Sequence, residues 1–398
     1  MRLSTSAIFD LKVQDLLSQQ AALSKTQSQI ATGKRVQTPA DDPVAAAQLH
    51  ELARARAQEE QFGKNSIIVS GRLQTEEQAL ADAHTLLQRV RELVLQSNTA
   101  SLNESDRQSI ATELKARSEE LLSIANRKDA IGEYLFSGYS TGTQPFARGA
   151  SGAVSYAGDS GARSLQVGAS LFTQDSDTGS RLFMNIPAGN GLFTTGASAA
   201  NTGSGVIDAG SIVNRSTWVA GAFQLSFSSA STWQVTDTSN VVVATGSYTS
   251  GSAIAFNGVQ IGITGVPAAG DTFTVASAGT QDMFSTLDGI VTALEKGAGS
   301  EATRAQLNSS LNGSLQQIDQ AADQLLTVRS QVGARLSMLD DADGTRRAQL
   351  TDLEVAAGQL GDLDYAAAVS KMSQQTVALQ AAQQTFASVA KLSLFNYL

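Results

Sequence analysis

The stretch Glu133–Phe146, EYLFSGYSTGTQPF, separates two kinds of sequence in this chain of 398 residues. Before it and after Gln281, apolar residues recur at spacings of three and four, which is the period of helices. Between Gly138 and Gly279 the pattern changes to alternation, and 22 of the 34 glycines lie there. The sequence therefore predicts helices over about the first 132 residues and at the C-terminal end, with a β-rich region inserted between them.

The pentapeptide GYSTG, Gly138–Gly142, fits the G-x-S-x-G pattern that presents a serine nucleophile in many hydrolases. That pattern needs a strand before the serine, a helix after it and a histidine later in the chain. Here a helical segment precedes Ser140, and both histidines, His50 and His84, come earlier. We therefore interpret the stretch as a structural corner. Its candidate residues are Tyr134, Phe136, Gly138, Pro145 and Phe146.

Apolar residues near the N-terminus form a heptad seam, with Gln20 and Gln27 at two of its seven positions. A second seam near the C-terminus carries Thr376 and Gln383. Because polar seam residues weaken pairing, we expect both helices to be loose in the monomer and to become ordered against each other and against neighbouring subunits. The apolar positions are Phe9, Val13, Leu16, Leu23, Ile30, Val369, Met372, Leu379 and Phe386, and the apolar tail adds Leu394 and Phe395.

A break interrupts the first helical segment at Thr32–Ala47, TGKRVQTPADDPVAAA. A glycine can end one helix here, and an aspartate followed by proline can begin the next. The adjacent acids Asp41 and Asp42 suit a helix cap and an ion pair with the basic residues of the GKR tripeptide better than an acid–base couple. The residues predicted to shape this corner are Gly33, Pro39, Asp41, Asp42 and Pro43.

The middle region contains three segments that are typical of strands and hairpins. Gly221–Ser229 alternates apolar and polar residues, and Asp271–Val275 repeats this pattern. Asn257-Gly258 predicts a tight hairpin turn between two strands. We therefore expect a β domain of roughly 130 residues, and whether it holds one or two subdomains stays open.

The composition and the failed motifs argue against several functions. Without cysteine, the chain forms neither disulfides nor thiolate sites. Its net charge of -9 is spread without a basic stripe, so we expect no nucleic-acid partner. No apolar run reaches ~18 residues, so we expect no membrane insertion. The N-terminus lacks a cleavable secretion signal, so if the protein leaves the cell, we expect it to leave by another route. Neither GKR nor DDADG, Asp340–Gly344, completes a phosphate or calcium loop, and we expect no catalytic residue, metal or cofactor.

Three motifs together resemble the flagellin superfamily. They are TGKRVQTPADDP, YLFSGYSTGTQPF and the C-terminal AAAVSKMSQQTVALQAAQQTFASVAKLSLFNYL. Within the superfamily, the opening MRLSTSAIF and the phrase YLFSGY followed by PF are more similar to the junction proteins between hook and filament than to flagellin. The resemblance is dense over about 1–145 and 281–398 and looser over the β-rich insertion.

The resemblance implies an α+β multidomain fold. Both termini would build a long helical rod, a coiled coil or bundle, with an inserted β-rich outer domain. The implied parts are inner terminal helices over 1–45 and 362–398, a helical rod over 46–140 and 281–361, and the outer insertion over 145–279.

The resemblance also implies a structural component of the bacterial flagellum that is not an enzyme. It would be exported by the flagellar type III system and act outside the cell. About eleven copies would form a ring, which is compatible with head-to-tail interfaces, since these build rings or helices rather than closed dimers. This ring would lie between the first hook-associated junction protein and flagellin, and an export chaperone would bind the C-terminal helix.

Two alternatives stay open from the sequence. The chain could serve as flagellin itself or as a minor filament subunit. More remotely, the insertion could be a glycan-binding or enzymatic module in a flagellin-like protein. Trp218 and Trp233 could stack on sugars, although a tryptophan in a small β domain is more often part of the core.

Overall fold

The structure, a computed structural model, describes residues 5–99 and 102–395, with side chains described over 9–99 and 102–388. It divides into two compact units, one of Met1–Lys64 with Ala342–Leu398 and one of Asn65–Asp341. Helices from both ends of the chain pack together and a β-rich domain is inserted between them, so the predicted fold class is confirmed.

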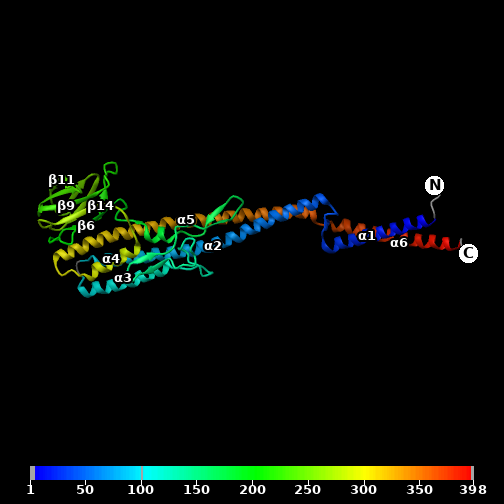
Figure 1. Cartoon of the computed structure of the whole chain (residues 1–398), viewed down its shortest axis with the longest axis horizontal. Coiled ribbons are helices and arrows are strands. Elements are labelled where there is room, and N and C mark those ends of the chain that lie inside the picture. The colour runs from blue at the N-terminus through cyan, green and yellow to red at the C-terminus, as the bar shows by residue number, and fades with distance from the viewer. Residues whose placement is uncertain (1–4, 100–101, 396–398) are drawn as a thin grey trace. The chain divides into compact units, whose positions relative to one another are not determined.

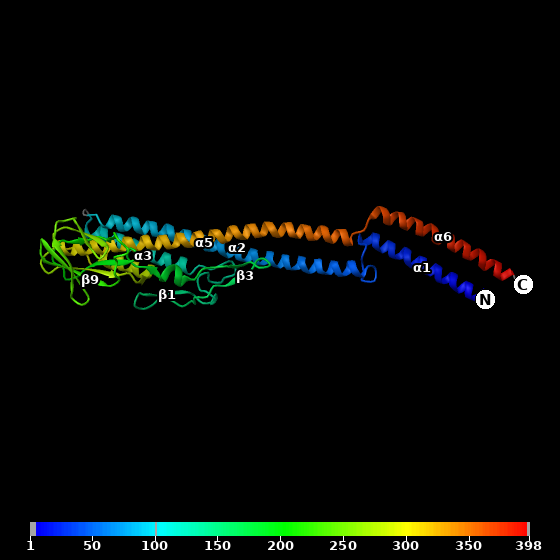
Figure 2. The same ribbon diagram turned by 90° about the horizontal axis from the view of Figure 1, so that it is seen from above.

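The first unit consists of helices from both ends of the chain. Helix α1 (Thr5–Thr32) lies beside α6 (Tyr365–Phe395), as Figures 1 and 2 both show. The unit also contains the first part of α2 (Pro43–Ser97) and the last part of α5 (Glu301–Gly361). Asp364 caps α6, since its carboxylate accepts hydrogen bonds from the backbone N–H groups that begin the helix.

Helix α2 passes through Gly63 and Gly71 without a break. The side chain of Arg346 on α5 explains the first of these glycines. A Cβ atom on Gly63 would lie 3.0 Å from Arg346 Nε, and Arg346 is itself mostly buried and 2.5 Å from Asp343 through Nη1. The missing side chain therefore makes room for a guanidinium group between the two helices, whereas a Cβ on Gly71 would meet open space.

The helices of the second unit share one hydrophobic core. The rest of α2 and of α5 packs with α3 (Glu104–Ala125) and α4 (Met283–Glu295). The largest fully buried side chains of this core are Leu73, Leu80, Leu87, Leu93, Leu114, Phe136, Phe146, Phe183 and Phe284.

Helix α3 ends at Ala125, so the prediction of helix to about residue 132 is wrong. Asn126 follows the helix and pairs with the backbone of Phe146, with Nδ2 donating to its carbonyl at 2.9 Å and Oδ1 accepting from its N–H at 3.0 Å. Ile131, which follows Ile124 by seven residues and so continues the apolar spacing of α3, lies beyond the helix and is 78% exposed. A tertiary bond to the corner therefore ends a helix that the apolar period would continue.

Short strands after the corner cover this helical core. They are β1 (Phe146–Arg148) with β2 (Val154–Tyr156), β3 (Ser164–Gln166) with β4 (Phe172–Gln174), and β5 (Ile186–Pro187) with β15 (Thr280–Gln281). A single π-helical turn, η1 (Ser180–Met184), buries Leu182 and Phe183 against the helices.

The outer β domain has a second core of its own. Its five-stranded antiparallel sheet has the order β11-β10-β9-β14-β6, and its second sheet has the order β12-β13-β7, with β8 also pairing with β13. The strands are β6 (Phe193–Ala197), β7 (Val206–Ile207), β8 (Ser211–Ile212), β9 (Ala222–Ser229), β10 (Thr232–Asp237), β11 (Val242–Ser247), β12 (Ala253–Phe256), β13 (Val259–Thr264) and β14 (Thr272–Ser277).

The strand pattern follows the sequence closely in this domain. Strand β9 buries Phe223, Leu225 and Phe227 as its alternation predicts. Asn257-Gly258 joins β12 to β13 with positive φ at both residues, as the predicted tight turn requires. The predicted insertion therefore contains two parts, because residues 146–186 pack on the helices and residues 193–275 enclose a separate core.

Replacing Gly63 by alanine should lower the stability of the protein, because the new methyl group meets Arg346 in a crowded position. We expect a net loss of about 1 kcal/mol, since overpacking outweighs the gain in helix propensity. Gly344→Ala on α5 is the matched control, because nothing lies within 4 Å of its Cβ position, and it should gain about 0.5–1 kcal/mol. Denaturant midpoints measure both, and a gain for both variants would contradict this role of Gly63.

Candidate assembly surface on the terminal helices

The contact between α1 and α6 is thin. Within 9–32 and 365–388, the only buried residues are Thr26 and Ala368, and both are small. The aromatic rings of Phe9 and Phe386 lie 4.9 Å apart between centroids and join the two helices at one point of the seam. Two helices side by side bury one face of each, so most of the surface of this pair stays accessible.

The observed seam differs from the predicted one at its polar positions. In α1, Gln20 and Gln27 are exposed, and Gln19 and Thr26 lie in the seam instead. In α6, Val369 and Gln383 are exposed, and the seam follows Ala368, Met372, Gln375, Leu379, Ala382 and Phe386. The same heptad fits both seams. Between Leu16 and Leu23, for example, a step of four leads to Gln20 and a step of three leads to Gln19.

Two amides in this seam lack partners. The Oε1 atoms of Gln19 and Gln375 are buried and have no hydrogen-bond partner among the described residues. Buried polar atoms without partners cost stability. We therefore expect the pair to be weak in the isolated chain.

Large apolar side chains point away from the seam. Leu17 on α1 is 59% exposed and Val377 on α6 is 63% exposed. The predicted contact residues Val13, Leu16, Leu23, Ile30, Met372 and Leu379 are half-buried, whereas Phe9 is 46% and Val369 49% exposed. The side chains of Leu394 and Phe395 lie outside the described residues. The terminal pair thus presents apolar surface that its own chain does not cover.

Residues far apart in the sequence form a corner that connects the start of the break with the end of α5. Gly33 has φ +68 and its carbonyl accepts from Leu363 N at 3.0 Å, while Arg35 N donates to the Gly361 carbonyl at 2.8 Å. Lys34 Nζ lies 2.5 Å from Asp362 Oδ1. A side chain at Gly33 would clash with the hydroxyl of Tyr365, so both the turn and the close approach require glycine.

The two aspartates of the break fix its turn and the start of α2. Asp42 Oδ1 accepts from Ala45 N at 3.0 Å, and its Oδ2 lies 3.1 Å from Arg35 Nη1; the backbone N–H and then the guanidinium lower the pKa of Asp42. Asp42 is thus the predicted N-cap, with Pro43 as the first helical residue.

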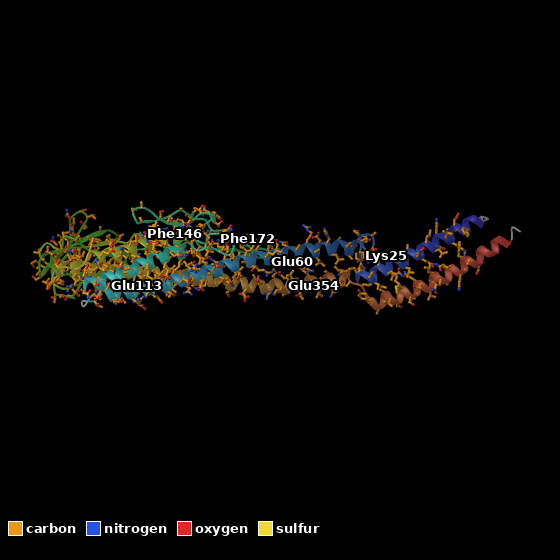
Figure 3. All side chains as sticks on the ribbon, turned by 90° about the horizontal axis from the view of Figure 1, so that it is seen from below. Lys25, Glu60, Glu113, Phe146, Phe172 and Glu354 are labelled. Atoms are coloured by element: carbon orange, nitrogen blue, oxygen red, sulfur yellow. The ribbon has the colours of Figure 1, made fainter. Side chains whose placement is uncertain are left out.

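Asp41 holds the turn that precedes this cap. Asp41 N donates to the Thr38 carbonyl at 3.0 Å, which closes a turn with Pro39 at its second position. Its carboxylate lies 2.5 Å from Nζ of Lys25, which is labelled on α1 in Figure 3, and accepts from two backbone N–H groups. The ammonium group and these N–H groups hold the pKa of Asp41 well below its usual value.

The second predicted corner is anchored by aromatic rings. Phe146, labelled in Figure 3, is buried with ring centroids of Phe183 and Phe284 at 5.5 Å each. Phe136 is also buried and meets Phe183 at 5.4 Å. Tyr134 lies under Lys128 Nζ at 4.5 Å from the ring centroid, and Pro145 is buried. Gly138 turns the chain with φ +71.

Ser140 belongs to the turn and faces a carboxylate. Its Oγ donates to Asp159 Oδ2 at 2.9 Å, and Asp159 Oδ1 accepts from the backbone N–H groups of Tyr139 and Gly161. These N–H groups lower the pKa of Asp159. The carboxylate therefore organises a turn, and both histidines lie on α2 and outside this turn.

Within 5–99 and 102–395, no group of three or more histidine or acidic side chains has the arrangement of a metal site. In the same ranges, no helix has the length and apolarity that crossing a bilayer requires.

Family models match both ends and the middle of the chain. The bacterial flagellin N-terminal helical region matches residues 6–141, and the bacterial flagellin C-terminal helical region matches residues 315–398. Residues 197–277, within the outer β domain, match the D2-like domain of flagellar hook-associated protein 1.

Similar proteins extend the match to the whole length. Flagellar hook-associated protein 3 of Escherichia coli (strain K12) is 25% identical over 397 residues, 100% of this chain and 99% of that protein. FlgL of Xanthomonas campestris is 37% identical with a TM-score of 0.74, and the match covers 77% of this chain and 99% of that one. The chain belongs to the flagellar hook-associated protein 3 (FlgL) family.

A further FlgL structure agrees with this membership. The flagellar junction protein FlgL of Legionella pneumophila is 34% identical with a TM-score of 0.73, over 79% of this chain and 100% of that one. The family therefore gives the chain a structural role in the flagellum, and the similar proteins are structural components rather than enzymes.

Sequence reasoning missed the partners that hold both corners in place. Lys25, Asp362 and Tyr365 complete the first corner, and Asp159 completes the second. Asp362, directly after the end of α5, was a usable signal for the first corner. A charged residue next to a helix end often pairs with another segment of the chain. Nothing local marked Asp159.

Gly138→Ala and Ser140→Ala separate a structural corner from a catalytic serine. Alanine at Gly138 needs a left-handed backbone and meets the side chain and carbonyl of Asp159, so we expect a loss of about 2 kcal/mol or more. Ser140→Ala should cause a much smaller loss, because two N–H groups still hold Asp159. Thermal denaturation measures both variants. A Ser140→Ala chain that folds normally but fails to support motility would contradict the structural role.

Proposed function

We propose that this chain is the subunit that joins the flagellar hook to the filament. Similarity along the full length to flagellar hook-associated protein 3 carries the proposal, and a similar Legionella protein is described as a flagellar junction protein. The subunit would bind the first hook-associated protein on one side and flagellin on the other. It would act outside the cell after export by the flagellar type III system.

The terminal helices supply a physical reason for assembly. A two-helix layer with a thin core and exposed Leu17 and Val377 gains stability when neighbouring subunits cover it. Contacts of this kind run head to tail, because different faces of one subunit meet, and they close into a ring of about eleven copies. The predicted contact positions of both seams, with Leu394 and Phe395, would belong to this interface.

The same weakness suits export. A pair of helices that is marginal alone can stay unfolded until it meets its neighbours. We propose that an export chaperone covers α6 before secretion, since its apolar residues need a partner at that stage. Residues 1–45 with 362–398 would then form the inner layer, 46–140 with 281–361 the rod, and 145–279 the outer insertion.

The alternatives receive less support. Flagellin models match only 6–141 and 315–398, whereas hook-associated protein 3 matches along the whole chain. For a glycan-binding insertion, the tryptophans would need free faces. Trp218 instead packs at 5.6 Å from Phe193 and 6.1 Å from Phe223, and Trp233 is half-buried against the same core.

Deletion of the gene tests the proposed function. Cells should carry bare hooks in electron micrographs and release flagellin into the medium, as a blot detects. Complementation with the intact gene should restore filaments. Normal filaments in the deletion strain would overturn the junction role, and loss of filaments together with loss of secreted flagellin would favour a filament subunit.

Leu17→Asp and Val377→Asp test the assembly surface. Exposed substitutions change monomer stability by only about 0.5 kcal/mol, so the purified variants should keep their helix content and melting temperature. In the deletion strain, however, either charge should abolish swarming, because it would be buried without a partner in the ring. Leu17→Met is the matched control and should swarm normally. Full swarming with both aspartates would contradict a role of this surface.

A further inference from the structure

The second unit contains a network of ion pairs around the segment that joins β4 to η1, in which the side chains of Arg72, Asp129, Asp175 and Asp177 are buried. Arg72 on α2 pairs with Asp129, with Glu133 at 3.2 Å and with Asp175 at 3.1 Å. Arg163 adds a second guanidinium group to Asp175 at 2.6 Å. Asp175 is fully buried, so its charge is compensated by two arginines inside the protein.

The neighbouring Asp177 is compensated in the same way. Arg335 on α5 approaches Asp177 Oδ2 at 2.8 Å, and Arg181 on η1 approaches Oδ1 at 3.2 Å. Four arginines thus meet four carboxylates in this network. Its members are Arg72, Arg163, Arg181, Arg335, Asp129, Glu133, Asp175 and Asp177.

Glu76 is a fifth acid in this region, and no arginine of the described residues forms an ion pair with it. It lies on α2 one turn after Arg72, its exposure is 0%, and it forms no ion pair with any described residue. Its Oε1 accepts one hydrogen bond, from Asp177 N at 3.0 Å, while its Oε2 is buried without a hydrogen-bond partner among the described residues. A fifth carboxylate charge here would be buried and uncompensated.

The surroundings of Glu76 favour its neutral form. The charged groups around it are Arg72 on its own helix, Asp175 and Asp177 on the adjacent segment, Arg335 on α5 and Arg181 on η1. Burial, and then the charge of Asp177, raise the pKa of Glu76 to about 8, and the hydrogen bond from the Asp177 N–H and the charge of Arg335 only partly oppose them. Neighbouring Glu77 differs, because it is partly exposed and pairs with Arg329 at 2.6 Å.

We propose that Glu76 is a proton-controlled latch. In its protonated form it lies beside Asp175 and Asp177 without repelling them, and its Oε1 accepts the N–H of Asp177. In its ionised form, burial of its charge and repulsion by these two carboxylates outweigh the stronger hydrogen bond and release the 173–177 segment. Release would also free the arginines of α5 and η1 from Asp177. The latch couples the rod helices to the strands after the corner, which lies beyond the junction role proposed above.

The sign of the pH dependence follows from the raised pKa. A carboxyl whose pKa is higher in the closed form than in the open form stabilises the closed form fully below its ordinary value of 4.5. This stabilisation is lost as pH rises from 4.5 to about 8. In that window, opening that exposes Glu76 becomes about tenfold easier per pH unit at most, because one proton is released.

Hydrogen exchange of the full-length protein tests the latch. Peptides that cover 173–184 are followed by mass spectrometry between pH 5.5 and 8.5, with rates corrected for intrinsic exchange. In the wild type, protection of these amides should fall by up to about tenfold per pH unit below pH 8. Glu76→Gln keeps the size of the side chain without its charge, so its protection should be independent of pH. Glu77→Gln is the matched control and should retain the wild-type pH dependence.

Two results would overturn the latch. One is constant protection of 173–184 across this pH range in the wild type. This result does not depend on whether any variant folds. The other is a Glu76→Gln variant that loses protection with pH as steeply as the wild type.

Discussion

The terminal part of this protein depends on the contact between α1 and α6, which buries few side chains. A layer of two helices buries one face of each and leaves the other faces to solvent or to a neighbour. Here the buried face itself is poor, because it rests on Thr26, Ala368 and a single ring contact between Phe9 and Phe386. We therefore expect much of its stability to come from neighbouring subunits, as the proposed assembly requires.

The second unit, in contrast, is held together by a large apolar core and by ion pairs. Its helices share a large apolar core, and the corner places Phe136 and Phe146 inside it. Ion pairs of Arg72 and Arg335 then attach the strands that follow the corner to α2 and α5. The outer β domain folds around a separate core, and β7 is hydrogen-bonded to Ser309 and Asn312 of α5. One chain thus combines parts with large apolar cores and a terminal helix pair that buries few side chains.

Much of this was accessible from the sequence, because periodicity reports local structure. Alternation located β9, Asn257-Gly258 located a hairpin, and Asp42-Pro43 located the start of α2. Gln20, Gln27 and Gln383 were misassigned to the seam, since a heptad does not distinguish Gln20 from Gln19, whereas Thr376 is half-buried. The end of α3 and the network around Glu76 depend on partners far along the chain, such as Phe146 and Asp177, and local patterns carry no such information.

Hydrogen exchange of the terminal helices, in the dilute monomer and in the assembled ring, tests the central claim most directly. The account predicts weak protection of α1 and α6 in the monomer, strong protection in the ring, and little change in the helices of the second unit. Full protection of both terminal helices in the dilute monomer would contradict it, because the pair would then be complete without neighbours.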